Sequence, residues 1–151
     1  MKGLEIGQSA SVTRVFSRED LGEYAALTAD VSPISGDEVD AGRTEIRRGV
    51  VPAPLLAGLF SYLLGTTLPG RGTNYLKQQL CFPALAYADE KIVATVEITR
   101  LRPEKELVNL RTVCKNPAGQ VVCEGDALVL VRDLEHDVEP QQFGSRGGDG
   151  C

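Results

Sequence analysis

Hydrophobic and polar side chains alternate along residues 91–101. The apolar positions are Ile92, Ala94, Val96 and Ile98. An apolar residue at every second position indicates a β-strand with one buried face. Less regular alternation runs through residues 73–82, 106–115 and 120–132. The second half of the chain therefore predicts four successive strands.

The last two of these segments are joined by the four residues Asn116-Pro117-Ala118-Gly119. Asparagine at the first position, proline at the second and glycine at the fourth are all favoured in a type I turn. These residues predict a tight turn between antiparallel strands.

Residues 16–27 carry helical periodicity instead. Ser17 precedes Asp20 by three positions, a variant of the capping box that starts many helices. Apolar residues then recur at helical spacing, at Leu21, Tyr24, Ala25 and Leu27. The pattern predicts a short amphipathic helix, followed by a loop in which Pro33 keeps the residue before it out of helical geometry.

Residues 51–65 predict a second helix. Pro52 and Pro54 are tolerated only at or before its first turn, and Gly65 is suited to end it. Apart from Ser61, the segment is apolar on nearly every face, which is typical of a buried helix. Together the elements predict an α+β fold in which a curved antiparallel sheet wraps around one central helix.

The composition excludes several classes of protein. A length of 151 residues, with 42% hydrophobic and 25% charged residues, is typical of one soluble domain. The formal net charge of -5 and the lack of a long Lys/Arg cluster argue against nucleic acid as a partner. The longest apolar run, residues 55–64, falls short of the about 20 residues that span a bilayer. We therefore predict no nucleic-acid or membrane partner.

The two ends of the chain suggest where it resides and where its domain stops. The first residues have no apolar signal-peptide core, which predicts a cytoplasmic protein. After residue 133 the sequence is polar and Gly-rich. We predict a domain over residues 1–133 and a disordered tail over residues 134–151. The single histidine, His136, is expected to be a solvated tail residue.

The four cysteines are scattered, without the C-x-x-C spacing of metal ligands, so no metal site and no cofactor are predicted. In a cytoplasmic protein they are expected to be reduced. Three of them lie in apolar segments and are expected to be small core residues: Cys81, Cys114 and Cys123.

Several motifs together resemble one family, the MaoC-like (R)-specific enoyl-CoA hydratases. The resemblance runs from about residue 4 to residue 131 and is most specific over residues 68–78, LPGRGTNYLKQ. It implies a hot-dog fold, usually in a homodimer or a higher homo-oligomer. It also implies a substrate that is a trans-2-enoyl thioester of CoA or of an acyl-carrier protein.

The catalytic motif of that family has the form D-x-N-P-[LIV]-H, with an alanine at a fixed spacing. Here Asp30, Pro33, Ile34 and Ala41 match it. Ser35 stands where the family has its catalytic histidine, and Ser32 stands in place of the usual asparagine. The resemblance therefore implies Asp30 as the catalytic base, with an altered partner at Ser35. Because a serine hydroxyl does not titrate near neutral pH, Ser35 can hold a water molecule but cannot act as a base.

A second departure lies before the central helix, where the family has His-Gly and this chain has Pro52-Ala53. The resemblance implies that the amide of this glycine holds the thioester oxygen, and Ala53 keeps a backbone N–H for that role. By the same resemblance, Ser61 lies near the site. Tyr75 and Gln78 fall in the segment that lines the acyl-thioester channel.

Plainer interpretations stand beside these. Asp30 before Ser-Pro is also suited to an Asx-type turn, and Ser61 to packing within a helix. Tyr75 and Gln78 are equally compatible with surface positions on a strand.

Three functions follow from the resemblance. The first is an enoyl-CoA hydratase or 3-hydroxyacyl-CoA dehydratase. The second is a thioesterase in which Asp30 activates water against the carbonyl. The third is a non-catalytic subunit that binds acyl-CoA.

Overall fold

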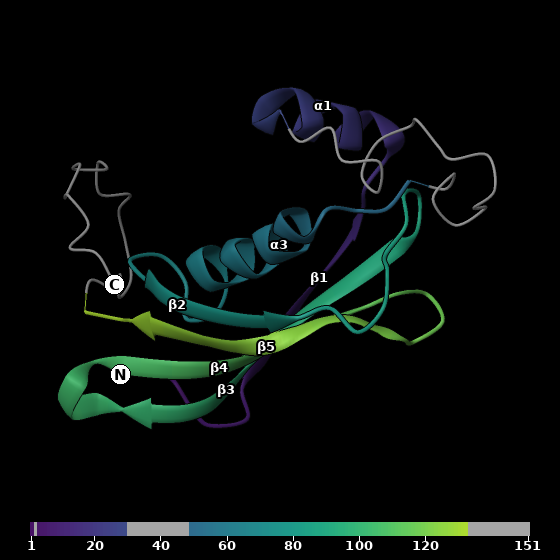
Figure 1. The fold of residues 1–151 in the computed structure, drawn as a ribbon. Helices are drawn as coiled ribbons and strands as arrows, with labels where there is room; N and C mark the ends of the chain where they lie inside the picture. Colours follow the sequence, from purple (N-terminus) through teal and green to yellow (C-terminus); the bar gives the residue numbers. More distant parts are fainter. Residues whose placement is uncertain (2, 30–48, 133–151) are drawn as a thin grey trace.

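The computed structural model describes residues 1, 3–29 and 49–132. The elements in chain order are β1 (Ser9–Val15), α1 (Arg18–Thr28), α3 (Ala53–Thr66), β2 (Asn74–Cys81), β3 (Lys91–Arg102), a 3-10 turn (Pro103–Lys105), β4 (Leu107–Lys115) and β5 (Val121–Leu130), as Figure 1 shows. The loop with Asp30 and Ser35 and the predicted tail, residues 134–151, lie outside the described residues.

The five strands form one sheet in the order β1-β3-β4-β5-β2, and every neighbouring pair is antiparallel. The four strands expected from alternation are confirmed. The turn between β4 and β5 is confirmed as well, because the carbonyl of Asn116 accepts a hydrogen bond from the Gly119 N–H at 2.9 Å. β1 was not expected from the sequence. It has polar residues at most positions, and its apolar residues are half-buried or, at Val15, exposed.

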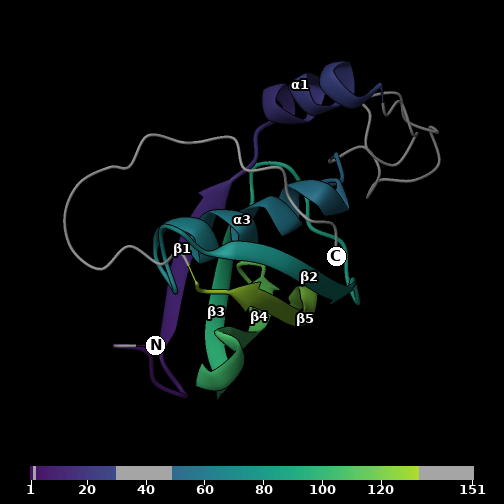
Figure 2. The same cartoon turned by 90° about the vertical axis from the view of Figure 1, so that its left-hand side faces the viewer.

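α3 lies across one face of the sheet, and α1 lies beyond it on the side away from the strands (Figures 1 and 2). The buried residues of α3 are Leu56, Leu59, Phe60, Leu63 and Leu64. The sheet meets them with a row of fully buried side chains on β3: Ile92, Ala94, Val96 and Ile98. The predicted α+β fold with a central helix against a curved antiparallel sheet is confirmed.

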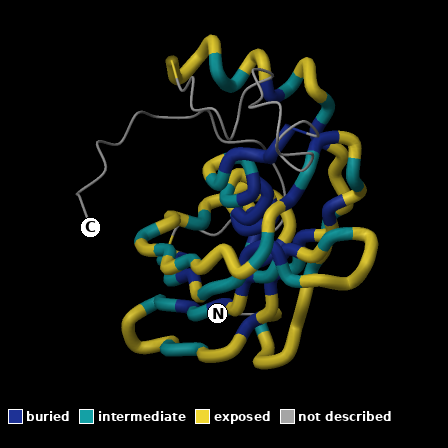
Figure 3. The backbone as a smooth tube through the Cα atoms, turned by 45° about the vertical axis from the view of Figure 1, so that its right-hand side comes forward, coloured by how far each residue is buried: buried dark blue, intermediate teal, exposed yellow. Residues whose placement is uncertain are grey.

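Burial of α3 on every side was expected but is wrong for the described part of the chain. Figure 3 colours exposed positions along the chain yellow and buried ones dark blue. Tyr62 is 54% exposed, and Pro54, Gly58, Ser61 and Thr66 are exposed as well. These positions recur every three or four residues, so they lie on one stripe of the helix. The sheet covers only the opposite side. A helix that is apolar on nearly every face thus keeps one stripe that the described residues leave uncovered.

α1 begins as its sequence predicts. Ser17 accepts a hydrogen bond from the Asp20 N–H at 3.1 Å, and the Asp20 carboxylate accepts one from the Ser17 N–H at 2.9 Å. Its apolar residues are less buried than expected, since Leu21 alone is buried and Leu27 is 87% exposed. Within the described residues, no helix is long and apolar enough to cross a membrane.

The contact between α3 and the sheet predicts the effect of one substitution. Leu59→Ala removes a side chain that is only 8% exposed and is expected to lower the free energy of unfolding by about 2–5 kcal/mol. Leu27→Ala is the matched control on an exposed helix position, expected to change stability by less than about 0.5 kcal/mol. Urea unfolding of both variants measures the difference. Equal midpoints for Leu59→Ala and the unsubstituted protein would contradict the packing.

Candidate active site

The first turn of α3 presents a backbone N–H at Ala53. Pro52 is the N-cap and Pro54 the second helical residue, and neither carries an N–H. The Leu55 N–H donates to the Pro52 carbonyl at 3.0 Å. Ala53 is the first residue of the helix, where an N–H has no acceptor inside the helix. The positive end of the helix dipole adds to the ability of this N–H to bind a developing negative charge.

The segment before α3 fixes where this N–H lies. The Val51 N–H donates to the Ala86 carbonyl at 2.8 Å, and the Ala88 N–H donates to the Gly49 carbonyl at 2.8 Å. Gly49 has a φ of 74°, and a Cβ there would lie 3.3 Å from Leu21. The start of α3 is therefore held against the connection between β2 and β3.

Ser61 lies about 12 Å along α3 from Ala53, at a rise of about 1.5 Å per residue. It belongs to the exposed stripe of the helix. Its hydroxyl has no hydrogen-bond partner among the described residues, whereas the Thr66 hydroxyl donates to the Tyr62 carbonyl one turn back. The alternative in which Ser61 is a packing residue bonded to a carbonyl one turn back therefore gains no support.

Tyr75 and Gln78 are brought together by a β-bulge in β2. Tyr75 lies opposite Val129 of β5, but Lys77 lies opposite Leu128, so β2 uses one extra residue at this step. Residues three apart on a regular strand point to opposite faces. After the bulge Gln78 lies opposite Ala127, which is buried on the same face as Val129. Both side chains therefore point to the face that α3 covers.

The Gln78 side-chain amide is held at both ends. Its Nε2 donates to Thr112 Oγ1 at 3.0 Å, to the Gln79 carbonyl at 3.0 Å and to the Asp126 carbonyl at 3.1 Å. Its Oε1 accepts a hydrogen bond from the Tyr75 hydroxyl. Thr112 is fully buried on β4 and is not among the site residues predicted from the sequence. A polar residue at an inward position of an alternating strand is the signal that would have found it.

The close approach of β2 to β5 at this point requires glycine. Gly125 lies opposite Leu80, and a Cβ on it would be 1.7 Å from the Gln79 carbonyl oxygen. Any side chain at residue 125 would push the strands apart and move Gln78 away from the Asp126 carbonyl.

The Tyr75 hydroxyl is neutral at physiological pH. Burial, and to a lesser extent the neighbouring Cys123, raise the pKa of Tyr75 from 10.0 to about 12. The residue is 36% exposed, but its hydroxyl points inward to Gln78. Because that hydroxyl donates to Gln78, its oxygen lone pairs stay available to accept a hydrogen bond from a ligand.

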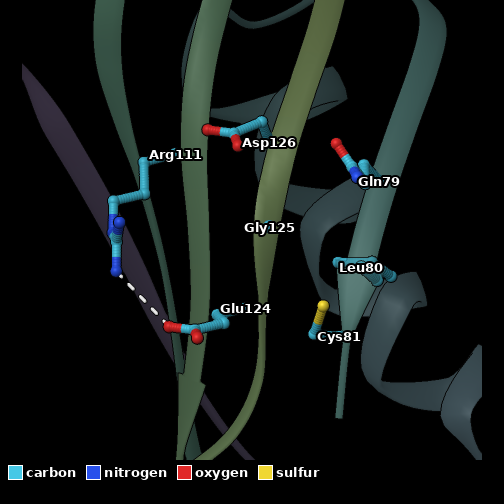
Figure 4. Close-up of a pocket in the computed structure, with 7 residues that line it drawn as sticks. All are labelled: Gln79, Leu80, Cys81, Arg111, Glu124, Gly125 and Asp126. Carbon is cyan, nitrogen blue, oxygen red and sulfur yellow. Dashed lines mark hydrogen bonds and ion pairs between the residues drawn. The ribbon is translucent and has the colours of Figure 1, made fainter.

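A shallow pocket of about 280 Å³ lies elsewhere, between β2, β4 and β5 (Figure 4). Its lining residues are Gln79, Leu80, Cys81, Arg111, Glu124, Gly125 and Asp126. Arg111 and Glu124 form an exposed ion pair at 3.4 Å. None of the predicted site residues lines this pocket. Cys81 is exposed, which corrects the prediction that it is a core residue.

The predicted site residues thus fall into three groups, and the structure describes two of them. Ala53 and Ser61 lie on α3, and Tyr75 and Gln78 form one network on β2. No hydrogen bond between described residues links the two groups. Asp30 and Ser35 lie outside the described residues. Within the described ranges, no three His, Cys, Asp or Glu residues are arranged to hold a metal ion, and the prediction that the protein needs no metal stays a prediction.

Proteins of known activity resemble this chain over most of its length. The (R)-specific enoyl-CoA hydratase of Aeromonas caviae is 37% identical over 128 residues, which cover 85% of this chain and 96% of the relative. The enzyme of the same name from Rhodospirillum rubrum is 41% identical over 125 residues, which cover 83% of this chain and 86% of that relative. The chain belongs to the (R)-specific enoyl-CoA hydratase family.

The fold agrees with this membership. The solved structure of the A. caviae (R)-hydratase superposes with a TM-score of 0.80 at 36% identity, covering 86% of this chain and 98% of the other. No family model matches the sequence. Two predictions from the sequence are therefore confirmed for this (R)-specific hydratase family member: the resemblance to the family and the hot-dog fold.

The Tyr75 network predicts a late tyrosine titration. In ultraviolet titration of the folded protein, one of the four tyrosines is expected to ionise near pH 12, and Tyr75→Phe removes that phase. The pKa is raised on folding, so Tyr75 contributes stability that is complete below pH 10.0 and is lost as the pH approaches about 12. Tyr62→Phe, at an exposed position, is the control. If Tyr62→Phe, and not Tyr75→Phe, removed the late phase, the assignment of that phase to Tyr75 would be wrong.

Proposed function

We propose that this protein adds water to the double bond of a trans-2-enoyl-CoA to give the (R)-3-hydroxyacyl-CoA, and catalyses the reverse dehydration. The observation that carries the proposal is identity of 37% and 41% to two (R)-specific enoyl-CoA hydratases over most of their lengths. The relatives named above are hydratases, so the thioesterase alternative has less support. The acyl-CoA is the substrate, and no further cofactor is proposed.

Asp30 is the proposed base. It would take a proton from a water molecule whose oxygen adds to C3 of the enoyl group. Negative charge then develops on the thioester oxygen, and a proton is delivered to C2. General acid–base groups typically contribute about 10²–10⁴-fold each, so the replacement of histidine by Ser35 is expected to give a slower hydratase.

The Ala53 N–H is proposed to bind the thioester oxygen. Its position at the start of α3 supports this role, since the N–H has no acceptor inside the helix and lies at the positive end of the helix dipole. A donor aimed at the oxygen where charge develops typically contributes about 10²–10³-fold in rate.

Ser61, Tyr75 and Gln78 are proposed to contact the thioester. The Ser61 hydroxyl lies on the exposed stripe of α3 and is not engaged by another described residue. The Tyr75 oxygen is held by Gln78 with its lone pairs available, which suits it to accept from an amide N–H of the substrate.

We further propose a homodimer. The exposed stripe of α3 includes Tyr62, and β2 is an edge strand of the sheet. An edge strand presents backbone groups that a second copy can pair. Sedimentation equilibrium measures the assembly, and a monomer at all concentrations would remove this proposal. The predicted cytoplasmic location stays a prediction.

Asp30→Asn tests the base. The substitution preserves the shape of the side chain and removes its basicity, so hydration of crotonyl-CoA is expected to fall by about 10²-fold or more while binding is retained. Loss of the enoyl absorbance measures turnover, and isothermal titration with butyryl-CoA measures binding. Asp37→Asn, at a nearby acidic residue to which we assign no chemistry, is the matched control. An unchanged rate in Asp30→Asn would exclude Asp30 as the base.

Ser35→His tests the altered partner. The imidazole restores a group that titrates near neutral pH, so crotonyl-CoA hydration is expected to rise. Pro52-Ala53 also differs from the family pattern, so a partial gain is expected. If wild type and Ser35→His are both inactive but bind acyl-CoA, the protein is the non-catalytic binding subunit. Release of free thiol from crotonyl-CoA in the same assay would indicate the thioesterase.

A further inference from the structure

The two cysteines that are buried in the described part of the chain lie directly opposite each other on neighbouring strands. Cys114 of β4 pairs with Cys123 of β5 in the antiparallel register. Directly opposite residues in such a pair have Cα atoms about 4.5 or 5.5 Å apart, depending on the hydrogen-bonding position. A disulfide requires Cα atoms about 4.4–6.8 Å apart, so either position meets the requirement.

The two thiols also share one face and one environment. Both side chains are fully buried, in the layer between the sheet and α3. A hydrogen bond between the two thiols, together with burial, raises the pKa of Cys114, and the same hydrogen bond lowers the pKa of Cys123. Each thiol is therefore close enough to alter the ionisation of the other.

We infer that Cys114 and Cys123 form a dithiol site that a two-electron thiol oxidant converts reversibly to a cross-strand disulfide. The thiolate of one cysteine attacks the oxidant, and the thiolate of the other then displaces the reduced oxidant from the first sulfur. One S–S bond forms and two S–H bonds are lost. With an azo oxidant, the two electrons and two protons pass to the N=N bond and leave it as a hydrazine.

The surrounding backbone accommodates this change. The Cβ atoms of opposite residues are about 4.5–5.5 Å apart, and a disulfide brings them about 1 Å closer. The ladder is already irregular beside the pair, because Lys115 lies opposite Val121 and β5 uses one extra residue there. The pair lies next to the Asn116–Gly119 turn, whose residues are mostly exposed. Access of a small oxidant to the pair requires this end of the hairpin to open.

The experiment uses the full chain with Cys81→Ser and Cys151→Ser, so that Cys114 and Cys123 are the remaining thiols. The folded protein is treated with the azo oxidant diamide, and a second sample is refolded from denaturant in a glutathione redox buffer. In both, the intact mass is expected to fall by two hydrogen atoms. Trypsin without reductant is expected to release residues 112–115 linked to residues 116–132, and dithiothreitol is expected to separate them.

Two comparisons keep the test specific. Cys114→Ala in the same background is expected to give no linked peptide and no loss of mass. In the unsubstituted protein, the exposed Cys81 is expected to react with iodoacetamide before Cys114 and Cys123. Two free thiols after both diamide treatment and redox refolding would overturn the inference, since refolding removes any barrier of access. A linkage between two chains in place of the intrachain bond would overturn it as well.

Discussion

The rest of the structure depends on the hydrophobic contact between α3 and the sheet. This contact removes Leu56, Phe60 and Leu63 from water. Each such side chain contributes about 1.5–3 kcal/mol when it is buried. The inward row of β3 supplies the matching surface. The same packing places Ala53 and Ser61, since both are carried on this helix. A change in how α3 lies on the sheet would move the N–H proposed to bind the thioester oxygen.

The polar network of β2 depends on that packing in a different way. Thr112 brings a hydroxyl into the buried layer, and an unpaired buried polar group costs about 1–3 kcal/mol. The Gln78 amide satisfies it and is itself tied to two backbone carbonyls. The Tyr75 hydroxyl then has one defined acceptor. The requirement to satisfy Thr112 therefore orients two residues at the edge of the sheet.

The departures from the family pattern affect distinct parts of the chemistry. Ser35 in place of histidine removes a group able to exchange protons, and leaves Asp30 as the proposed base. Pro52-Ala53 in place of His-Gly keeps a backbone donor at the first residue of the helix. Proline has no N–H and its φ suits the start of a helix, so Pro52 and Pro54 leave Ala53 as the single N–H between them. The proposed site keeps a backbone donor for the thioester oxygen and has a serine where the family has its histidine.

The sequence by itself determined most of the fold. Period-two alternation located β2 to β5, the Asn116–Gly119 turn joined β4 to β5, and Ser17 with Asp20 placed the start of α1, because each is a local pattern of residues. The family motifs identified Asp30, Ala53 and Ser61 as candidates by type and spacing. β1 was not predicted, because it has few apolar residues of its own and is a strand through its pairing with β3.

Tertiary structure alone decided which side chains meet. The extra residue in β2 turns Tyr75 and Gln78 to one face, although a spacing of three predicts opposite faces. The register of β4 with β5 places Cys114 opposite Cys123, nine positions further along the chain. The uncovered stripe of α3 also depends on the sheet, which covers one side of a helix that is apolar nearly all round. The extra residues that shift the register of β2 and β5, and the side of α3 that the sheet covers, depend on contacts between elements, which the alternation within one strand does not specify.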